Sequence, residues 1–331
     1  MKLLSVIIPT YNMENYLPRC LDSLIKNPKI LEYIQILVIN DGSKDKSSEI
    51  AHRYANQYPN SIEVIDKENG NYGSCINRGI KEATGKYVKV LDADDSFCTD
   101  GLSEVIQCLK SEKLVVDMVI TNYIVNNTQT RIQQHISYQL PKNQELSFDN
   151  PFIAKKLYGI QMHAIIYRTD LLKEIDYKQT EGISYTDQEW CFYPMIKVNT
   201  IRYLDITLYD YLIGREGQTM SLASMKKMIS HLVIVAKRML NYFSSLDKNK
   251  ISKSRYLYLE HRVLVRYKDI YRFYLVILRK NEFTKSEFKA LDQDLKNKSK
   301  ILYTMVGIKS VLKRKVPIPY VILYRLFRIR L

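Results

Sequence analysis

The chain has 331 residues, of which 46% are hydrophobic and 26% are charged, and it contains 11 glycines and 9 prolines. This composition excludes a disordered or fibrous protein and is typical of a folded chain that buries a large core. Because one ordinary core rarely fills a chain of this length, we expect a main domain with a smaller companion.

The net charge of +15 is concentrated in the C-terminal third of the chain. Residues 225–331 contain 26 Lys and Arg but 7 Asp and Glu, whereas residues 1–224 carry a net charge of −4. This break predicts two domains, which we place at residues 1–222 and 223–331. A strongly basic second domain indicates an anionic partner. No nucleic-acid-binding module accompanies the charge, so a membrane surface is favoured over nucleic acid.

The cysteines and the apolar segments indicate the compartment. The five cysteines are odd in number and form no C-x-x-C pair, which disfavours a disulfide framework or a zinc site and fits a reducing cytoplasm. The apolar run at residues 3–8 is too short for a secretory signal. No run of 18 apolar residues occurs that would span a bilayer. We therefore expect a cytoplasmic protein whose membrane contact is peripheral, at the inner face of the cell membrane.

Apolar runs at residues 3–8, 34–39, 62–65 and 87–91 alternate with helical segments at 14–26, 46–57 and 74–84. This β-α-β-α order predicts a doubly wound α/β sheet whose ligand crevice lies at the carboxyl ends of the strands. Even spacing of apolar residues within 116–140 predicts an antiparallel strand and hence a mixed sheet. Three-to-four spacing beyond residue 222 predicts a C-terminal helical appendage.

Three carboxylates, Asp92, Asp94 and Asp95, follow the apolar run that ends at Leu91. Carboxylates packed this closely raise one another's pKa unless a cation or hydrogen-bond donors compensate. Oxygen ligands suit Mg²⁺ or Mn²⁺, which would hold a diphosphate leaving group and neutralise its developing charge. The alternative is an acidic loop that opens the next helix, with Asp95 as its cap.

Four motifs occur in order, at Ser5 to Asn12, Val38 to Ser43, Asn69 to Ile80 and Leu91 to Asp95. Together they resemble glycosyltransferase family 2 over roughly the first 220 residues. The resemblance implies a GT-A, Rossmann-like mixed sheet flanked by helices. It also implies an inverting, metal-dependent transfer of a sugar from a nucleoside diphosphate.

The resemblance assigns the nucleotide to the first two motifs. It implies that Pro9, Thr10, Tyr11 and Asp41 hold the uracil and ribose of a UDP-sugar. Tyr11 offers a stacking face, and the Asp41 carboxylate can accept the imide N–H of uracil. As alternatives, Tyr11 is a loop aromatic and Asp41 belongs to an ordinary turn.

The resemblance assigns different roles to the carboxylates of the acidic motif. It makes Asp94 the direct ligand of Mg²⁺ or Mn²⁺, whereas Asp92 supports the ribose or the metal shell. Ala93 lies between them in the donor site.

One position departs from the family pattern. Many members carry an arginine before the asparagine of the third motif, where it touches the diphosphate, but here Ile76 precedes Asn77. This form resembles a branch of bacterial surface-polysaccharide transferases. We therefore expect Lys89, Asn77 or Arg215 to contact the diphosphate.

An inverting transfer needs a base that removes the proton of the acceptor hydroxyl as its oxygen attacks the anomeric carbon. The resemblance assigns this role to Asp187, the second position of the family's E-D motif, although Thr186 replaces the usual Glu. Glu189 is the second candidate. Trp190, the only tryptophan, either stacks on an acceptor ring or packs in the core.

Two further segments carry candidate residues. The segment 209–221 resembles the family's closing loop, in which Arg215 would reach the pyrophosphate as part of a lid. His163 resembles an acceptor-site histidine of the same branch, although a lone histidine beside an apolar strand is more often a core residue.

The last segment, residues 301–331, contains seven Lys and Arg and no acidic residue. Its arginines interleave with apolar residues after Pro319, as in a basic amphipathic helix that lies on an anionic leaflet. The alternative is a helix that packs on the catalytic domain through its apolar side.

The sequence predicts an inverting hexosyltransferase that acts in cell-surface polysaccharide or glycoprotein glycan synthesis. Its donor would be a UDP-sugar carrying a hexose or N-acetylhexosamine, and its acceptor a hydroxyl of a glycan or lipid-linked molecule. The alternative is a non-catalytic nucleotide-sugar-binding or scaffold subunit of a membrane-associated complex, which Ile76 and Thr186 favour. Self-association is compatible with the sequence.

Overall fold

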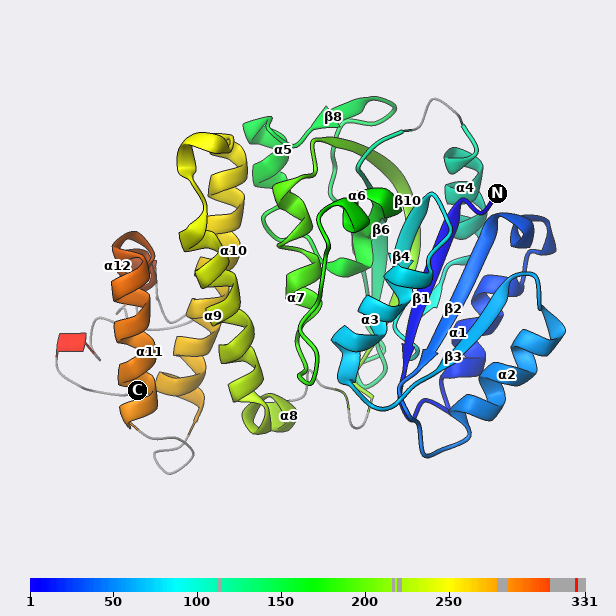
Figure 1. Cartoon of the computed structure of the whole chain (residues 1–331), viewed down its shortest axis with the longest axis horizontal. Coiled ribbons are helices and arrows are strands. Elements are labelled where there is room, and N and C mark those ends of the chain that lie inside the picture. The colour runs from blue at the N-terminus through cyan, green and yellow to red at the C-terminus, as the bar shows by residue number, and fades with distance from the viewer. Residues whose placement is uncertain (112–114, 216–217, 219–221, 279–284, 310–324, 327–331) are drawn as a thin grey trace. The chain divides into compact units, whose positions relative to one another are not determined.

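Figure 1 shows the computed structural model, which describes residues 1–111, 115–215, 218, 222–278, 285–309 and 325–326. The chain divides into two compact units, Met1–Gln218 and Thr219–Leu331. The sequence places the corresponding boundary between residues 222 and 223. All described strands belong to the first unit, and the described part of the second unit is helical.

The first unit is built on one ten-stranded sheet. Its strand order is β3 (Ile62–Asp66), β2 (Ile34–Asn40), β1 (Leu4–Thr10), β4 (Tyr87–Val90), β9 (Ile165–Arg168), β6 (Met118–Asn127), β10 (Thr200–Ile213) and β5 (Ser96–Phe97). Two short strands complete it, β7 (Gln133–Ile136) on β6 and β8 (Glu145–Ser147) on β10. Strands β1 to β4 pair in parallel, whereas β9 is antiparallel to both of its neighbours. The mixed sheet confirms the predicted fold class.

Strand β1 shows that the sheet is covered on both faces. Leu4, Val6, Ile7 and Ile8 are all fully buried, although successive side chains of a strand point to opposite faces. The flanking helices are α1 (Leu17–Ile25), α2 (Ser47–Gln57), α3 (Asn71–Glu82), α4 (Thr99–Leu109), α5 (Pro151–Lys156), α6 (Thr169–Glu174) and α7 (Asp187–Trp190). Helix α3 lies so close to β1 that a Cβ on Gly79 would be 2.5 Å from the Ile7 side chain.

The described helices of the second unit are α8 (Leu222–Lys227), α9 (Ile229–Ser245), α10 (Lys253–Arg272), α11 (Lys285–Lys298) and α12 (Lys300–Lys309). Helix α9 buries Val235, Ala236, Met239, Leu240 and Phe243, which recur at the three-to-four spacing that predicts it. The predicted helical appendage is confirmed. None of the helices that the structure describes is long and apolar enough to cross a membrane.

Most of the basic tail, residues 310–324 and 327–331, lies outside the described residues, so its amphipathic helix stays a prediction. Arg325 is described, and it packs within the second unit. Its guanidinium donates to Asp292 Oδ1 and to the Tyr303 carbonyl, each at 2.8 Å. It also lies 3.3 Å from the centre of the Tyr303 ring. At this residue the tail packs on the unit's own helices.

Candidate active site

The polar residues that follow β1, β2 and β4 meet at one edge of the sheet. These strands are parallel, and their register pairs Thr10 with Asn40 and Asn40 with Asp66. Strands β2 and β4 flank β1 on opposite sides, so the connections leave this edge in opposite directions and a crevice opens between them. Three of the predicted motifs therefore belong to one region.

A pocket of 530 Å³ lies at this edge. Its lining consists of Tyr11, Asn40, Gly42, Lys44, Asp66, Lys67, Glu68 and Asn69. Tyr11 is 45% exposed, so its ring is accessible to a ligand. Pro9 and Thr10 are the last residues of β1, and the Thr10 hydroxyl donates to the Ile8 carbonyl within that strand. Of the residues that the sequence assigns to the nucleotide, Tyr11 is thus the one in the pocket wall.

Asp41 lies behind this pocket and is 2% exposed. Its Oδ1 accepts from Lys67 Nζ at 2.6 Å and from the Gly70 N–H at 2.9 Å. The Asn69 side chain donates to the Asp41 carbonyl at 2.9 Å. In this conformation Asp41 therefore orders the loop that forms the pocket wall. Lys67 is not among the residues that the sequence assigns to the site, and its place directly after β3 is the signal that points to it.

Asp92 and Asp94 have different partners. The Tyr72 hydroxyl donates to Asp92 Oδ1 at 2.8 Å, and Arg215 Nε donates to Asp94 Oδ2 at 2.5 Å. The structure thus brings together Asp94 and Arg215, two predicted residues far apart in the sequence, and Ala93 is buried beside them. The rest of the predicted lid, residues 216–217 and 219–221, lies outside the described residues.

Asp95 joins the acidic loop to the sheet. It is fully buried, and its carboxylate accepts from the Tyr209 hydroxyl and the Leu212 N–H, each at 2.7 Å. It therefore fastens this loop to β10. The alternative that Asp95 caps the next helix is wrong, because α4 begins at Thr99 with Cys98 in the cap position.

The acidic cluster carries more negative charge than its hydrogen bonds compensate. Burial, together with the charge of Asp94, raises the pKa of Asp92 to about 7. Burial, with the charges of Asp94 and Asp92, raises the pKa of Asp95 well above its usual range. A nearby cation relieves the cost of ionising such groups.

His163 adds a nitrogen ligand to this cluster, which fits a divalent cation. Asp92, Asp95 and His163 each offer one ligand atom, and these atoms lie within 4.8 Å of one another. His163 is 9% exposed, and its Nδ1 has no hydrogen-bond partner among the residues that the structure describes. Burial, with the charge of Lys89, lowers the pKa of His163 to about 3, so the imidazole is neutral, as a metal ligand must be. The sequence predicts Asp94 and Asp92 as ligands and does not point to His163 for this role.

Asp187 is the first residue of α7. Its charge contributes to the raised pKa of both Asp92 and Tyr72, which places the Asp187 carboxylate near them. The Gln188 side chain donates to Asp187 Oδ2 at 2.7 Å, and Asp187 is half-buried. A partly accessible carboxylate in this position is suited to accept a proton.

The other two candidates of this segment have structural roles. Glu189 is fully buried, and its carboxylate accepts from the Thr180 N–H and hydroxyl, each at 2.7 Å. Trp190 is 1% exposed and packs edge-on against Tyr167 and Tyr177. Glu189 is therefore not available as the base, and the Trp190 ring is not available to an acceptor.

Lys89 is held within the core. It is fully buried, and its ammonium donates to the carbonyls of Met162, His163 and Ile165 at 3.0, 2.5 and 3.1 Å. Burial lowers its pKa to about 7. Because the three carbonyls use all three of its donors, the prediction that Lys89 contacts the diphosphate is wrong. Lys89 instead fixes the segment that carries His163.

Asn77 connects α3 to a distant segment. Its Oδ1 accepts from the Gln179 N–H at 2.8 Å, and its Nδ2 donates to the Gln179 carbonyl at 2.9 Å and to Glu181 Oε1 at 2.8 Å. Both ends of the amide are engaged within the chain in this structure, and the diphosphate contact of Asn77 stays a prediction. Of the three residues expected to replace the missing arginine, Arg215 is the one that forms an ion pair with a carboxylate of the acidic cluster.

Residues 5–176 match the family model described as glycosyl transferase family 2. The chain is 43% identical over 105 residues to an uncharacterised glycosyltransferase of Mycoplasma pneumoniae and 39% identical over 115 residues to the minor teichoic acid biosynthesis protein GgaB of Bacillus subtilis. It is 29% identical over 213 residues to the uncharacterised glycosyltransferase YibD of Escherichia coli. These matches cover 31%, 35% and 63% of this chain. They cover 35%, 13% and 61% of the relatives, so the chain spans less than two thirds of each.

Solved structures share the fold at low identity. The S. aureus TarS 1–349 fragment in complex with UDP-GlcNAc gives a TM-score of 0.62 at 22% identity, covering 92% of this chain and 81% of that one. A mannosyltransferase of Pyrobaculum calidifontis in complex with GDP-Man and Mn²⁺ gives a TM-score of 0.53 at 14% identity, covering 92% and 82%. These likenesses establish the GT-A fold. Since the family model matches more than half of its residues, the chain belongs to glycosyl transferase family 2.

Proposed function

We propose that the chain is an inverting glycosyltransferase that transfers a hexose or N-acetylhexosamine from a UDP-sugar to a hydroxyl of a glycan or lipid-linked acceptor. The observation that carries the proposal is the half-buried Asp187 carboxylate, which lies near enough to the acidic cluster for its charge to help raise the pKa of Asp92. This arrangement supports the proposal of a proton acceptor beside residues suited to a diphosphate and its cation.

The donor assignment rests on the pocket that contains Tyr11. Tyr11 stacks on the uracil, Pro9 and Thr10 support it from β1, and Asp41 keeps the opposite loop in place. The UDP-GlcNAc complex of TarS, a protein of the same fold, supports a UDP-sugar as the donor.

In this proposal Asp94 and Asp92 hold the cation, and His163 lies close to Asp92. Bound Mg²⁺ or Mn²⁺ would supply positive charge to the diphosphate as the sugar leaves it. The Mn²⁺ complex of the archaeal mannosyltransferase supports a divalent cation in this fold. Arg215, which is paired with Asp94, brings a second positive charge to the same place.

The Asp187 carboxylate accepts the proton of the acceptor hydroxyl. The acceptor oxygen forms a bond to the anomeric carbon while the bond between that carbon and the diphosphate oxygen breaks, and UDP leaves with the electron pair. A single displacement of this kind inverts the anomeric configuration.

The acceptor is a cell-surface polymer in this proposal. One relative is named a minor teichoic acid biosynthesis protein, which supports this acceptor class. Such synthesis would place the enzyme in the cytoplasm at the inner face of the membrane, where the basic second unit contacts anionic lipid.

A thermal-shift screen of nucleotide sugars with Mn²⁺ tests the donor and the cation, because a ligand that binds the native state raises its melting temperature. UDP-sugars should raise the melting temperature, EDTA should reverse the effect, and Asp94→Asn should remove it. A shift that GDP-sugars alone produce, or one that persists in EDTA, contradicts the assignment.

Two residues favour a second function, that of a non-catalytic nucleotide-sugar-binding or scaffold subunit. Ile76 and Thr186 occupy positions that are polar in the family pattern, and both are fully buried. Thr186 Oγ1 accepts from the Gln179 side chain at 2.9 Å. Hydrolysis of the sugar nucleotide by the purified chain separates the two functions. Turnover that Asp187→Asn abolishes identifies the enzyme, and binding without turnover identifies the scaffold.

A further inference from the structure

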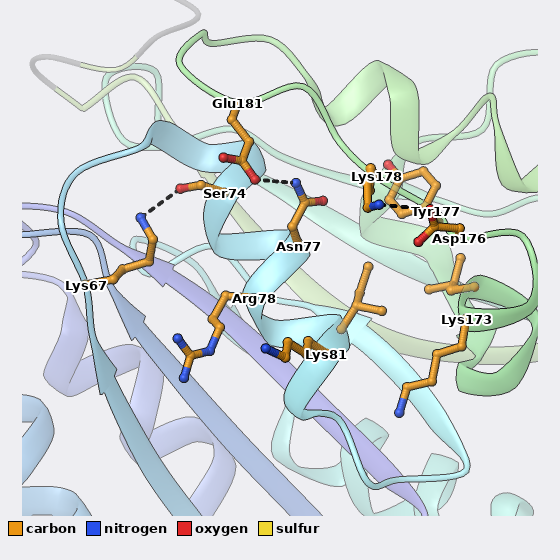
Figure 2. Close-up of a pocket in the computed structure, with 12 residues that line it drawn as sticks. Lys67, Ser74, Asn77, Arg78, Lys81, Lys173, Asp176, Tyr177, Lys178 and Glu181 are labelled. Carbon is orange, nitrogen blue, oxygen red and sulfur yellow. Dashed lines mark hydrogen bonds and ion pairs between the residues drawn. The ribbon is translucent and has the colours of Figure 1, made fainter.

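A second pocket, of 650 Å³, lies along α3 (Figure 2). One wall is the helix face that carries Ser74, Asn77 and Lys81, which share a side because they recur at helical spacing. The other wall is formed by lining residues between 172 and 181. Lys67 contributes to this pocket and to the nucleotide pocket, so the two are neighbours.

The second pocket is positively charged. Five basic side chains, Lys67, Arg78, Lys81, Lys173 and Lys178, line it, together with two acidic ones. Neighbouring carboxylates partly neutralise three of the five, since Lys67 pairs with Asp41, Arg78 with Glu82 and Lys178 with Asp176.

Two basic side chains of this pocket form no ion pair with an acidic residue in the part of the chain that the structure describes. Lys173 donates to the Ala83 carbonyl at 3.0 Å, which is a neutral partner. Lys81 is exposed and forms no hydrogen bond or ion pair with the residues that the structure describes. Beside them, Ile80, Leu172 and Tyr177 are buried lining residues that offer an apolar floor.

We propose that this pocket binds the phosphate groups of a phosphodiester-linked acceptor polymer. Cations beside an apolar floor fit a chain of sugar or polyol units joined by phosphates. The phosphates pair with Lys81 and Lys173, and the carbon faces of the units lie on the floor. This inference rests on the proposed transferase function, for which it names the acceptor.

The pocket shares a wall with the segment that leads to Asp187. Asn77 holds Gln179 and Glu181 against α3, and the Gly182 N–H donates to the Gly70 carbonyl at 2.9 Å. The Thr180 N–H and hydroxyl both donate to Glu189 in α7, the helix that Asp187 begins. A polymer bound in the pocket therefore lies along the segment that positions the proposed base.

Fluorescence anisotropy of a labelled glycerol phosphate oligomer with the full chain tests the inference. The wild-type chain should bind the oligomer, with an affinity that falls as salt rises. Lys81→Gln should weaken binding about threefold and Lys81→Glu should weaken it further, whereas Lys81→Arg should bind as the wild type does. Lys155→Gln is the matched control, because Lys155 is also exposed but lies on α5, outside both pockets.

Four competitors identify the source of the phosphate: the unlabelled oligomer, a neutral oligosaccharide, inorganic phosphate, and vesicles of anionic phospholipid. Displacement by the unlabelled oligomer alone supports the inference. Equal binding by Lys81→Glu and the wild type overturns it, as does equal displacement by vesicles or by inorganic phosphate. UDP-sugar binding, measured separately on the wild-type chain, reports on the proposed function. Oligomer binding without donor binding overturns the proposed transferase function, whereas the assignment of the second pocket as an anion-binding site is retained.

Discussion

Asp187 and Glu189 are two residues apart in one short helix, and their surroundings give them opposite roles. Asp187 is half-buried and lies near the acidic cluster, whereas both oxygens of Glu189 accept hydrogen bonds from Thr180. Chemical type alone does not separate two neighbouring carboxylates. Accessibility and hydrogen-bond saturation do.

We therefore expect Asp187→Asn to abolish transfer while leaving donor binding intact. Loss of a positioned general base costs on the order of 10²- to 10⁴-fold in kcat. Steady-state kinetics and a thermal shift with the UDP-sugar measure the two effects. Glu189→Gln is the contrasting variant, in which the melting temperature should fall because Thr180 loses a charged acceptor. Full kcat in Asp187→Asn would refute the assignment.

Asp92 gives the stability of the apo protein a pH dependence. Its pKa is about 7 in the folded chain and about 4 in an unfolded one. Between these values the folded state retains a proton that the unfolded state has lost, so the contribution to stability falls as pH rises from about 4 to 7.

Asp92→Asn should remove this loss of stability at higher pH. In EDTA, the stability of the variant relative to the wild type should rise through that pH window by up to about 1 kcal/mol per pH unit, roughly 2–4 °C in melting temperature. Melts at pH 5 and pH 8 measure the difference. Mn²⁺ should reduce the wild type's loss, because the cation replaces the proton on Asp92. Parallel pH profiles for the two proteins would show that Asp92 is not the group responsible.

Two residues that the sequence assigns to the diphosphate have other partners in the structure. Lys89 and Asn77 have side chains that can bind a diphosphate, and both lie in or beside the predicted motifs. Lys89 is buried and donates its hydrogen bonds to backbone carbonyls. Asn77 hydrogen-bonds to Gln179, which is more than one hundred residues away in the sequence. A linear pattern shows which donors exist but does not show which are already used.

At the scale of elements, α3 connects the parts of the site. Its Tyr72 reaches Asp92, its Ser74 accepts from Lys67 at the pocket wall, and its Asn77 holds Gln179. The helix approaches the 179–182 segment closely, since a Cβ on Gly73 would lie 2.0 Å from the Thr180 carbonyl oxygen.

Gly73→Ala should therefore push this segment away from α3. We expect a loss of about 1–3 kcal/mol in unfolding free energy and a lower kcat, because the segment positions Asp187. Gly159→Ala is the matched control, since a Cβ there meets no atom within 4 Å, and its stability should stay within about 0.5 kcal/mol of the wild type. Equal stability of the two variants would show that the contact is unimportant.

Much of the sheet was predictable because β1, β2 and β4 are mainly apolar, and strands buried on both faces need such a composition. The sequence did not single out β9 or β10. Strand β10 mixes polar and apolar residues along its length, and its register with β6 shifts twice. Its position depends on partners remote in the sequence, which periodicity does not encode.

At the scale of the whole chain, the two units differ in charge as well as in structure. The second carries a net charge of +19 and the first one of −4, and the break in charge lies close to the boundary between the compact units. Arg325 packs on Asp292 and Tyr303, so this residue of the tail contacts helices of the second unit. The remaining basic residues of the tail carry the predicted membrane contact.

We expect the full chain to co-sediment with vesicles that contain anionic phospholipid, and not with neutral vesicles. Replacing Lys313, Arg314 and Lys315 together by Gln should weaken this binding on the order of a hundredfold, because each basic residue near the surface contributes about 1 kcal/mol. The matched control replaces Lys296, Lys298 and Lys300, which removes the same charge from α11 and α12. If both triple variants lose binding equally, net charge alone explains the attraction and the tail has no special part in it.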